Sequence, residues 1–507
     1  MSAERRPSLD PERVATGVPN LDRVLGGGLL RGATAMLMGA PGTGKTILAQ
    51  QIAFHRAARG EGTLCLTGYS EPHDKLLVHL RAFTFFEPAY VGRLVHYASL
   101  PDLLRQGSEE TEDAIVATAR KFDVSQVVLD GFRSMRRLLL DEAATARFLY
   151  SLGAKLALLG KSTLVTVEGD PGERARYPEL TVCDVILALR REPIGSRFRR
   201  LLDVVKVRGA APIEGLHPFT IDEHGLTVYP RFESTVPAGE TGWTNDRVAL
   251  GLPDVDRLLG GGPAVGTCTL LAGSVGIGKT LLGLHFAAEG VRRTEPVLFL
   301  GFHESAQQLH EQGAAFGLEL RAAEARGLLR LLPLPAYDLE ADRIAALLRD
   351  DVEARGVRRL VIDTVGELER SVADRARVPE FLAALVRYLR ARRVTTVLTL
   401  DLPTIIGPAL DVGATPLGVV AENLVLMRQA EYLGRLHNVL SVLKMRFSSF
   451  DRTLHEFTIT AGRGIELVGP APPAVGLLTG VARPLEDLPP QAASMHTEES
   501  RGDDPDR

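Results

Sequence analysis

The stretch GAPGTGKT at residues 39–46 decides the fold, and the chain repeats it as GSVGIGKT at residues 273–280. Both copies satisfy the pattern G-x-x-x-x-G-K-[ST], in which backbone amides curl around phosphate oxygens. Each follows a short apolar run and precedes a helical stretch, and this setting is the one that the motif requires. The sequence therefore predicts two phosphate-binding loops, each placed at a helix N-terminus that adds partial positive charge.

Each predicted loop assigns a role to its residues. The glycines allow the backbone to curl, the lysine reaches the β- and γ-phosphates, and the threonine hydroxyl holds Mg²⁺. We therefore expect ATP and Mg²⁺ as the bound cofactors. The expected contacts are Gly39, Gly42, Gly44, Lys45 and Thr46 in the first loop and Gly273, Gly276, Gly278, Lys279 and Thr280 in the second.

The rest of the chain is also written twice. Matching stretches recur at offsets of 233 to 238 residues, and this near-constant spacing extends over about 190 residues. The period is far too long for a solenoid, so the pattern indicates tandem duplication of a whole domain. The matched pairs are TGVPNLDRVLGGGLLRG (16–32) with LGLPDVDRLLGGGPAVG (250–266), VVLDGF (127–132) with LVIDTV (360–365), and VVKVRG (204–209) with VLKMRF (442–447).

The size and composition fit this duplication. The chain has 507 residues, 45% of them hydrophobic, which is enough for two or three domains. We expect a flexible N-terminus at 1–12, a first P-loop domain at 13–230, a linker at 231–247, a second P-loop domain at 248–470 and a disordered tail at 471–507. The two domains are called the first and second copy below.

Within each copy, short apolar runs alternate with helical stretches. Runs such as ATAMLMG, TLCLTG, QVVLDG and STLVTVEG have the length and composition of buried strands. Such alternation predicts an α/β fold with a mostly parallel sheet flanked by helices. The later runs DVILALRRE and RFRRLLDVVKVRG are short, close together and flanked by polar residues, and they predict an antiparallel extension of the sheet.

Charge and cysteine content exclude several classes of protein. A net charge of −4 argues against a protein that coats nucleic acid, and the basic stretch at 189–200 is interpreted as a solvated hairpin. Cys65, Cys183 and Cys268 lie far apart without metal-ligand spacing, which indicates reduced core residues. No apolar run of about 18 residues occurs, so we expect a cytoplasmic protein without a membrane span.

Carboxylates end two of the predicted strands in both copies. Asp130 and Asp363 follow VVL and LVI, and a carboxylate at this end of a strand beside a phosphate loop holds the Mg²⁺ shell. Glu168 and Asp401 end the next strand and lie 233 residues apart. This second pair either senses the γ-phosphate and orients water or caps a turn, and the sequence leaves both roles open.

These motifs, in this order, strongly resemble KaiC-type ATPases of the RecA/RadA superfamily over about residues 12–230 and 246–468. The resemblance implies two tandem RecA-like P-loop domains, ATP at subunit interfaces, a two-tiered homohexamer and regulatory protein partners. It also implies that a Lys-x-Arg segment of one subunit reaches the nucleotide of its neighbour, where a cation neutralises developing phosphate charge. The matching residues are Lys206 and Arg208 in the first copy and Lys444 and Arg446 in the second.

The chain departs from the family at the position of the catalytic base. KaiC-type domains carry two adjacent glutamates there, and one of them polarises the attacking water. The repeat offset places Tyr69–Ser70 at this position in the first copy and His303–Glu304 in the second, while Glu71 lies one step beyond it. A carboxylate orients water well, and neutral tyrosine or serine does not. His303 is either a base or an ordinary solvated loop residue.

We therefore expect an ATP-binding ring that acts as a regulatory switch, with structural ATP in the first copy and slow hydrolysis through Glu304 in the second. A Ser/Thr autokinase of the circadian-clock KaiC type is one alternative. The hydroxyl pair of that activity aligns near Gly418 and Val419, and Thr415 is the nearby hydroxyl. A RecA/RadA-like DNA-dependent ATPase is the other alternative, although no appended DNA-binding module is recognisable.

Overall fold

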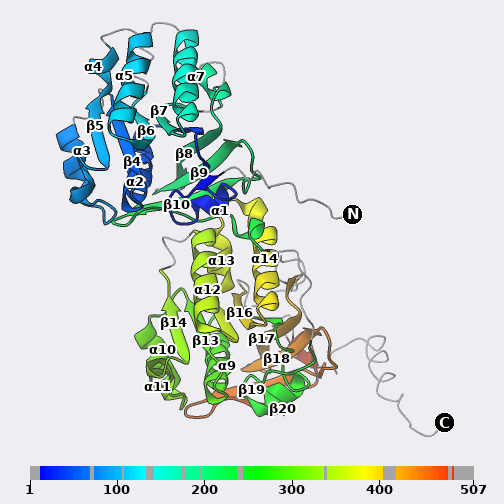
Figure 1. The fold of residues 1–507 in the computed structure, drawn as a ribbon. Coiled ribbons are helices and arrows are strands. Elements are labelled where there is room, and N and C mark those ends of the chain that lie inside the picture. Colours follow the sequence, from blue (N-terminus) through cyan, green and yellow to red (C-terminus); the bar gives the residue numbers. More distant parts are fainter. Residues whose placement is uncertain are drawn as a thin grey trace, which may run out of the picture. The chain divides into compact units, whose positions relative to one another are not determined.

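The computed structural model describes residues 12–68, 73–104, 108–132, 142–170, 172–173, 177–194, 197–236, 244–335, 340–402, 418, 420–477 and 482–484. The chain divides into two compact units, Met1–Thr235 and Val236–Arg507, coloured blue to green and green to red in Figure 1. The division falls within the expected linker. Each unit is described by itself.

The first copy is built around a nine-stranded sheet of order β11-β10-β9-β8-β3-β7-β6-β4-β5. Its strands are β3 (Thr34–Gly39), β4 (Gly62–Thr67), β5 (Val95–Ser99), β6 (Val124–Asp130), β7 (Ser162–Val167), β8 (Val185–Ile194), β9 (Arg197–Val207), β10 (Leu216–Asp222) and β11 (Gly225–Val228). Its helices are α1 (Leu21–Val24), α2 (Lys45–Ala58), α3 (His73–Leu80), α4 (Leu100–Leu104), α5 (Ser108–Lys121) and α7 (Glu142–Leu158). The short strands β1 (Arg13–Val14) and β2 (Leu29–Leu30) pair separately.

The second copy repeats this topology in a sheet of order β14-β13-β15-β16-β12-β17-β18-β19-β20. Its strands are β12 (Cys268–Gly273), β13 (Val297–Gly301), β14 (Leu329–Pro333), β15 (Arg359–Asp363), β16 (Thr395–Asp401), β17 (Asn423–Tyr432), β18 (Arg435–Met445), β19 (His455–Thr460) and β20 (Gly464–Pro470). Its helices are α8 (Pro253–Leu258), α9 (Lys279–Arg292), α10 (Ala306–Ala315), α11 (Leu320–Ala325), α12 (Ala341–Arg355), α13 (Val365–Ser371) and α14 (Val378–Ala391).

Both sheets have the predicted mixed character, which confirms the α/β, tandem P-loop fold. In the first copy, β8, β3, β7, β6, β4 and β5 are parallel, whereas β9, β10 and β11 extend the sheet in antiparallel fashion. Both faces are buried, as expected for a parallel sheet under helices. Leu37 of β3 belongs to the core beneath α2, whereas Met36 and Met38 belong to the core beneath α5 and α7.

The basic stretch at 189–200 forms part of the hairpin between β8 and β9. Two of its cations have partners within the hairpin: Arg199 pairs with Glu192 at 2.9 Å, and the Arg191 guanidinium lies 4.1 Å from the centroid of the Phe198 ring. Arginine held in this way is already engaged, and this agrees with the interpretation as a hairpin face.

Three further expectations concern smaller features. All three cysteines are buried and free, and burial raises the pKa of each thiol to about 12, so they are unreactive core residues.

Among the described helices, none is both long and apolar enough to cross a bilayer. Within the expected tail, β21 (Ala474–Val475) pairs with β22 (Arg483–Pro484), whereas 478–481 and 485–507 lie outside the described residues.

We predict that Phe299→Ala destabilises the second copy by about 3–5 kcal/mol, because a fully buried ring in β13 is replaced by a cavity. Amide hydrogen exchange should become faster across 248–471. Val468→Ala, at a side chain that is 63% exposed on β20, is the matched control and should change stability by less than about 0.5 kcal/mol. An equal increase in the rate of amide exchange across 14–233 would contradict the expectation that each copy has its own stable core.

Candidate functional site

The two phosphate loops have the backbone shape that their glycines permit. Gly44 and Gly278 precede α2 and α9 with φ values of 105° and 103°, a region that favours glycine. A side chain would also not fit at either position. A Cβ on Gly44 would lie 2.6 Å from Cδ1 of Ile221, and one on Gly278 would lie 2.8 Å from Cδ1 of Ile459. These glycines are therefore required both by conformation and by close packing.

The loop lysines occupy equivalent positions. Both are buried, and each ammonium group donates hydrogen bonds to the first two carbonyl groups of its own loop. Phosphate oxygens can take over these donor hydrogens when a nucleotide binds. The contacts are Lys45 Nζ to Gly39 O (2.8 Å) and Ala40 O (3.0 Å), and Lys279 Nζ to Gly273 O (3.1 Å) and Ser274 O (2.6 Å).

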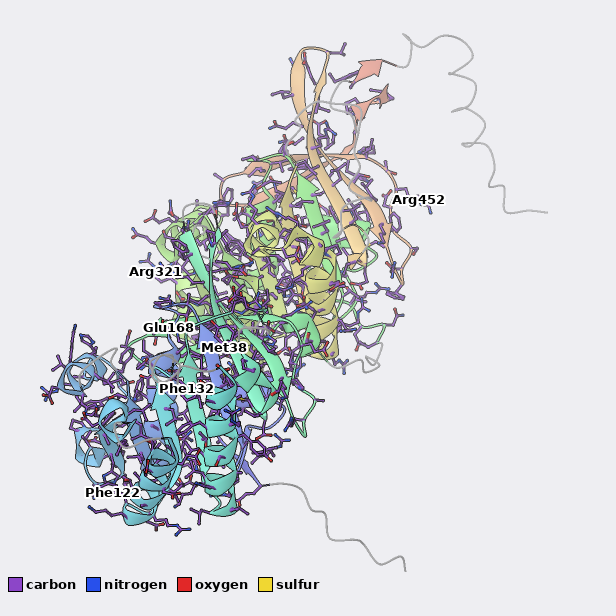
Figure 2. The ribbon with its side chains drawn as sticks, turned by 90° about the horizontal axis from the view of Figure 1, so that it is seen from above. Met38, Phe122, Phe132, Glu168, Arg321 and Arg452 are labelled. Atoms are coloured by element: carbon purple, nitrogen blue, oxygen red, sulfur yellow. The ribbon has the colours of Figure 1, made fainter. Side chains whose placement is uncertain are left out.

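The strand-end acids face these lysines. Asp401 Oδ1 lies 2.8 Å from Lys279 Nζ, since β12 and β16 are paired so that Asp401 stands beside the start of the loop. In the first copy, Glu168 follows β7 next to Met38 of β3 (Figure 2). Burial lowers the pKa of Lys45, and the negative charge of Glu168 opposes that shift. Both acids therefore lie at the loop end of the sheet, close to the loop lysine of their copy.

In each copy, a threonine hydroxyl and an aspartate carboxylate lie close together as possible oxygen ligands for a cation. Thr46 Oγ1 lies 3.1 and 3.2 Å from the two carboxylate oxygens of Asp130, and Thr280 Oγ1 lies 2.8 Å from Asp363 Oδ2. Among the described residues, no cluster of three or more His, Cys, Asp or Glu side chains could hold a metal alone. This donor set fits Mg²⁺, which takes one or two protein oxygens and completes its shell with phosphates and water.

Sequence reasoning missed a threonine behind each of these aspartates. Thr166 Oγ1 donates to Asp130 Oδ1 at 2.5 Å, and the Thr399 hydroxyl donates to Asp363 Oδ1. Both threonines are buried, and each lies on the strand between the aspartate's strand and the P-loop strand. The signal was present, since the two residues share the 233-residue offset and precede the strand-end acid by two positions.

The candidate base of the second copy lies among other carboxylates. Glu304 follows β13, whose last residue is paired in register with Asp363 of β15. Burial, and then the negative charges of Asp363 and Asp401, raises the pKa of Glu304. His303 points elsewhere: its side chain is 53% exposed, and Nε2 lies 3.5 Å from Glu367 Oε1 on α13. The charges of the strand-end acids thus act on Glu304, whereas the contact of His303 is with α13.

Some predicted positions lie outside the described residues. They are Tyr69, Ser70 and Glu71 of the first copy and Thr415 and Val419 of the second. The contrast between the two catalytic positions, and the autokinase alternative, therefore stay predictions.

The Lys-x-Arg segments lie at the opposite edge of their sheets from the phosphate loops. In the second copy, Gly273 at the loop end of β12 pairs with Met427, whereas Met445 of β18 pairs with Asn423 at the other end of β17. At about 3.3 Å per residue, Arg446 therefore lies roughly 16 Å from Gly273, measured along the strands. The first copy has the same register.

The lysines of these segments are anchored in the same way in both copies. Each ammonium group contacts two backbone carbonyls of the segment that precedes β8 or β17. Lys206 Nζ lies 3.4 Å from Leu180 O and 3.2 Å from Thr181 O, and Lys444 Nζ lies 3.1 Å from Gly418 O and 2.7 Å from Ala421 O.

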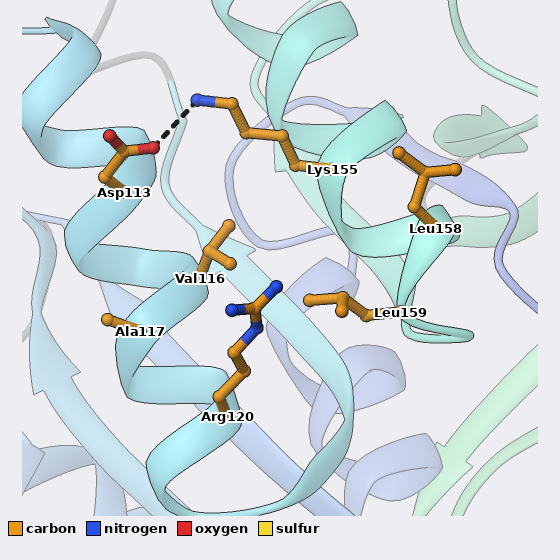
Figure 3. A pocket seen from close by; sticks show the side chains of 7 residues that line it. All are labelled: Asp113, Val116, Ala117, Arg120, Lys155, Leu158 and Leu159. Atoms are coloured by element: carbon orange, nitrogen blue, oxygen red, sulfur yellow. Dashed lines mark hydrogen bonds and ion pairs between the residues drawn. The ribbon is translucent and has the colours of Figure 1, made fainter.

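A surface hollow of about 370 Å³ lies between α5 and α7 of the first copy (Figure 3). Lys155 and Asp113 bridge it at 2.9 Å, and the side chains of Arg120, Leu158 and Leu159 line one end. That end adjoins the starts of β6 and β7, opposite the phosphate loop. It is therefore separate from the nucleotide site.

Fold and site together define a tandem P-loop nucleotide-binding protein. A family model described as "ATPase: KaiC" matches residues 14–233 and again 248–471. The chain is 27% identical to "Circadian clock protein KaiC3" of Synechocystis sp., over 92% of this chain and 94% of the relative. It is 26% identical to "Circadian clock oscillator protein KaiC" of Picosynechococcus sp., over 89% of each. The chain therefore belongs to the KaiC family of ATPases.

We predict that Thr399→Val weakens Mg²⁺ binding in the second copy, because Asp363 loses the hydroxyl that orients it. The Mg²⁺ concentration that half-saturates ATP turnover should rise by about 10–100-fold. Thr399→Ser retains the hydroxyl and is the matched control. An unchanged Mg²⁺ dependence in the valine variant would show that Thr399 does not orient the metal ligand.

Proposed function

We propose that this protein is a KaiC-like ATPase that binds Mg²⁺·ATP in both copies and assembles into a homohexameric ring with ATP at the subunit interfaces. The observation that carries the proposal is the position of the Lys-x-Arg segments. Arg208 and Arg446 lie at the sheet edge opposite the phosphate loop of their own copy. A cation so placed meets a phosphate only when another subunit supplies it, as in a ring of repeated head-to-tail contacts.

The two copies would divide the work. In the second copy, the raised pKa and half-buried setting of Glu304 support a role as the group that orients water and accepts its proton. In the first copy, the corresponding residues are Tyr69 and Ser70, so ATP there would act mainly as an interface ligand. Slow turnover in one tier and nucleotide-dependent contacts in the other suit a regulatory switch that changes protein partners.

The bound nucleotide would be held by groups already described. Backbone amides of each loop and the lysine would contact the phosphates, while Thr46 with Asp130, or Thr280 with Asp363, would hold the Mg²⁺ shell. The metal would neutralise charge on the β- and γ-phosphates. Asp401 would exchange its contact with Lys279 for an interaction with the γ-phosphate or the attacking water.

Glu304→Gln should lower the rate of phosphate release by about 10²–10⁴-fold with little change in ATP affinity, because the amide cannot accept a proton. Steady-state turnover and binding of labelled ATP measure the two effects separately. His303→Gln is the matched neighbour and should reduce turnover far less. Turnover that persists in Glu304→Gln and disappears in Lys45→Ala would invert the roles of the two copies.

Assembly should depend on nucleotide, and chiefly on the first copy. Native mass spectrometry should show a hexamer with Mg²⁺ and ATP, and smaller species after chelation of the metal and removal of nucleotide. Lys45→Ala should impair assembly more than the turnover that remains per assembled chain, whereas Lys279→Ala should do the reverse. A hexamer that is stable without nucleotide would contradict ATP as an interface ligand.

A further inference from the structure

In both copies, an acidic side chain lies at the equivalent position beside the Lys-x-Arg segment. Asp184 Oδ2 accepts a hydrogen bond from the Thr34 amide at 2.9 Å, and Glu422 Oε2 accepts one from the Cys268 amide at 2.8 Å. The two amides are 234 residues apart and begin the strand that leads to the phosphate loop. In both copies, therefore, one carboxylate oxygen accepts a hydrogen bond from the amide that begins the P-loop strand.

The backbone around this acid is also the same. The carbonyl of Asp184 accepts from the Arg208 amide at 2.9 Å, and the carbonyl of Glu422 accepts from the Arg446 amide at 3.1 Å. Each acid is thus fixed directly beside the arginine that we propose to act across the subunit interface.

The second carboxylate oxygen has different partners in the two copies. Asp184 Oδ1 pairs with the guanidinium of Arg208 at 3.2 Å, and the same guanidinium donates to Thr181 O at 3.3 Å. Glu422 Oε1 instead pairs with Arg390 of α14. Arg208 is therefore bound within its own chain, whereas Glu422 is already occupied by another cation.

The position of Arg390 explains the difference. The repeat offset of 233 aligns it with Ala157 of α7, whose side chain ends at Cβ. The surroundings agree: a Cβ on Gly32 would lie 3.6 Å from Cα of Ala157, and a Cβ on Gly266 would lie 3.6 Å from the carbonyl oxygen of Arg390. The first copy therefore lacks the side chain that competes for the acid.

Arg446 consequently differs from Arg208. It is exposed, and within the described part of the chain its side chain has no hydrogen bond or ion pair. Two cations lie close to it. Burial, and then the charge of Arg446, lowers the pKa of Lys444. Arg390 is also close enough to be affected by that charge. An anion from outside the copy would relieve this repulsion.

We infer that Asp184 restrains the interface arginine of the first copy, whereas Arg390 releases that of the second by occupying Glu422. This inference rests on the proposed interface role of Arg208 and Arg446. It makes Asp184 and Arg390 positioning residues. Arg446 is poised for the phosphates of a neighbouring subunit's ATP, and Arg208 must first break an ion pair.

The size of the restraint follows from its exposure. The side chains of Arg208 and Asp184 are 56% and 29% exposed, so solvent screens the pair and its effect on phosphate binding is about two- to five-fold. Salt should reduce the effect further, because the Debye length falls from about 10 Å at 0.1 M to about 3 Å at 1 M.

The test uses the full-length chain with Lys279→Ala as the parent, so that labelled Mg²⁺·ATP reports the first copy, at concentrations where native mass spectrometry shows assembly. Asp184→Asn keeps an oxygen for the Thr34 amide but removes the charge. We expect its ATP dissociation constant to fall about two- to five-fold, with the difference shrinking at high salt. Arg208→Ala should weaken binding.

Ala157→Arg is the second variant, because it leaves Asp184 unchanged and supplies the competing cation at an exposed position of α7. It should tighten binding as Asp184→Asn does. If neither variant tightens binding while Arg208→Ala weakens it, the restraint is disproved and the interface role stands. If Arg208→Ala also has no effect, the proposed interface role of this arginine fails together with the inference.

Discussion

The pairing of the P-loop strand between its two parallel neighbours is the constraint on which the rest of the structure depends. In the second copy, β12 lies between β16 and β17, so the carboxyl ends of the strands gather the loop, Asp401 and Asp363 at one edge. The same pairing carries the antiparallel extension back to the other edge, where Arg446 stands. The loop and the Lys-x-Arg segment are thereby kept apart within one copy.

In the proposed ring, this separation gives subunit contact a chemical role. The loop, the proposed metal ligands and the candidate base lie at one edge, and a cation from another subunit would complete that site. The acids at the loop edge also bring negative charges close together. These charges, in addition to burial, raise the pKa of Glu304. Lys279, Mg²⁺ and a trans-acting arginine would each lower this electrostatic cost, and in the proposed ring nucleotide binding and subunit contact would therefore be coupled.

The duplication offers a comparison inside a single chain. Positions near the loop match closely: Thr166 and Thr399 hydrogen-bond to the two strand-end aspartates in the same manner. Positions around the Lys-x-Arg segments do not, since Ala157 replaces Arg390 and the partner of the adjacent acid changes with it. The copies thus share the arrangement around the loop and differ in the side-chain contacts of the arginine that we propose to act across the subunit interface.

The sequence by itself determined the tandem α/β fold, the two G-x-x-x-x-G-K-[ST] loops, the aspartates at the strand ends and the duplication, because each depends on local pattern or on a constant offset. It marked Thr166 and Thr399 only as a repeated pair and did not reveal their contacts with the aspartates, nor the partners of Asp184 and Glu422, because these contacts join segments distant in the chain. Only the tertiary structure decided that Arg208 and Arg446 stand away from their own loops. Strand register sets that position, and register is a property of the assembled sheet.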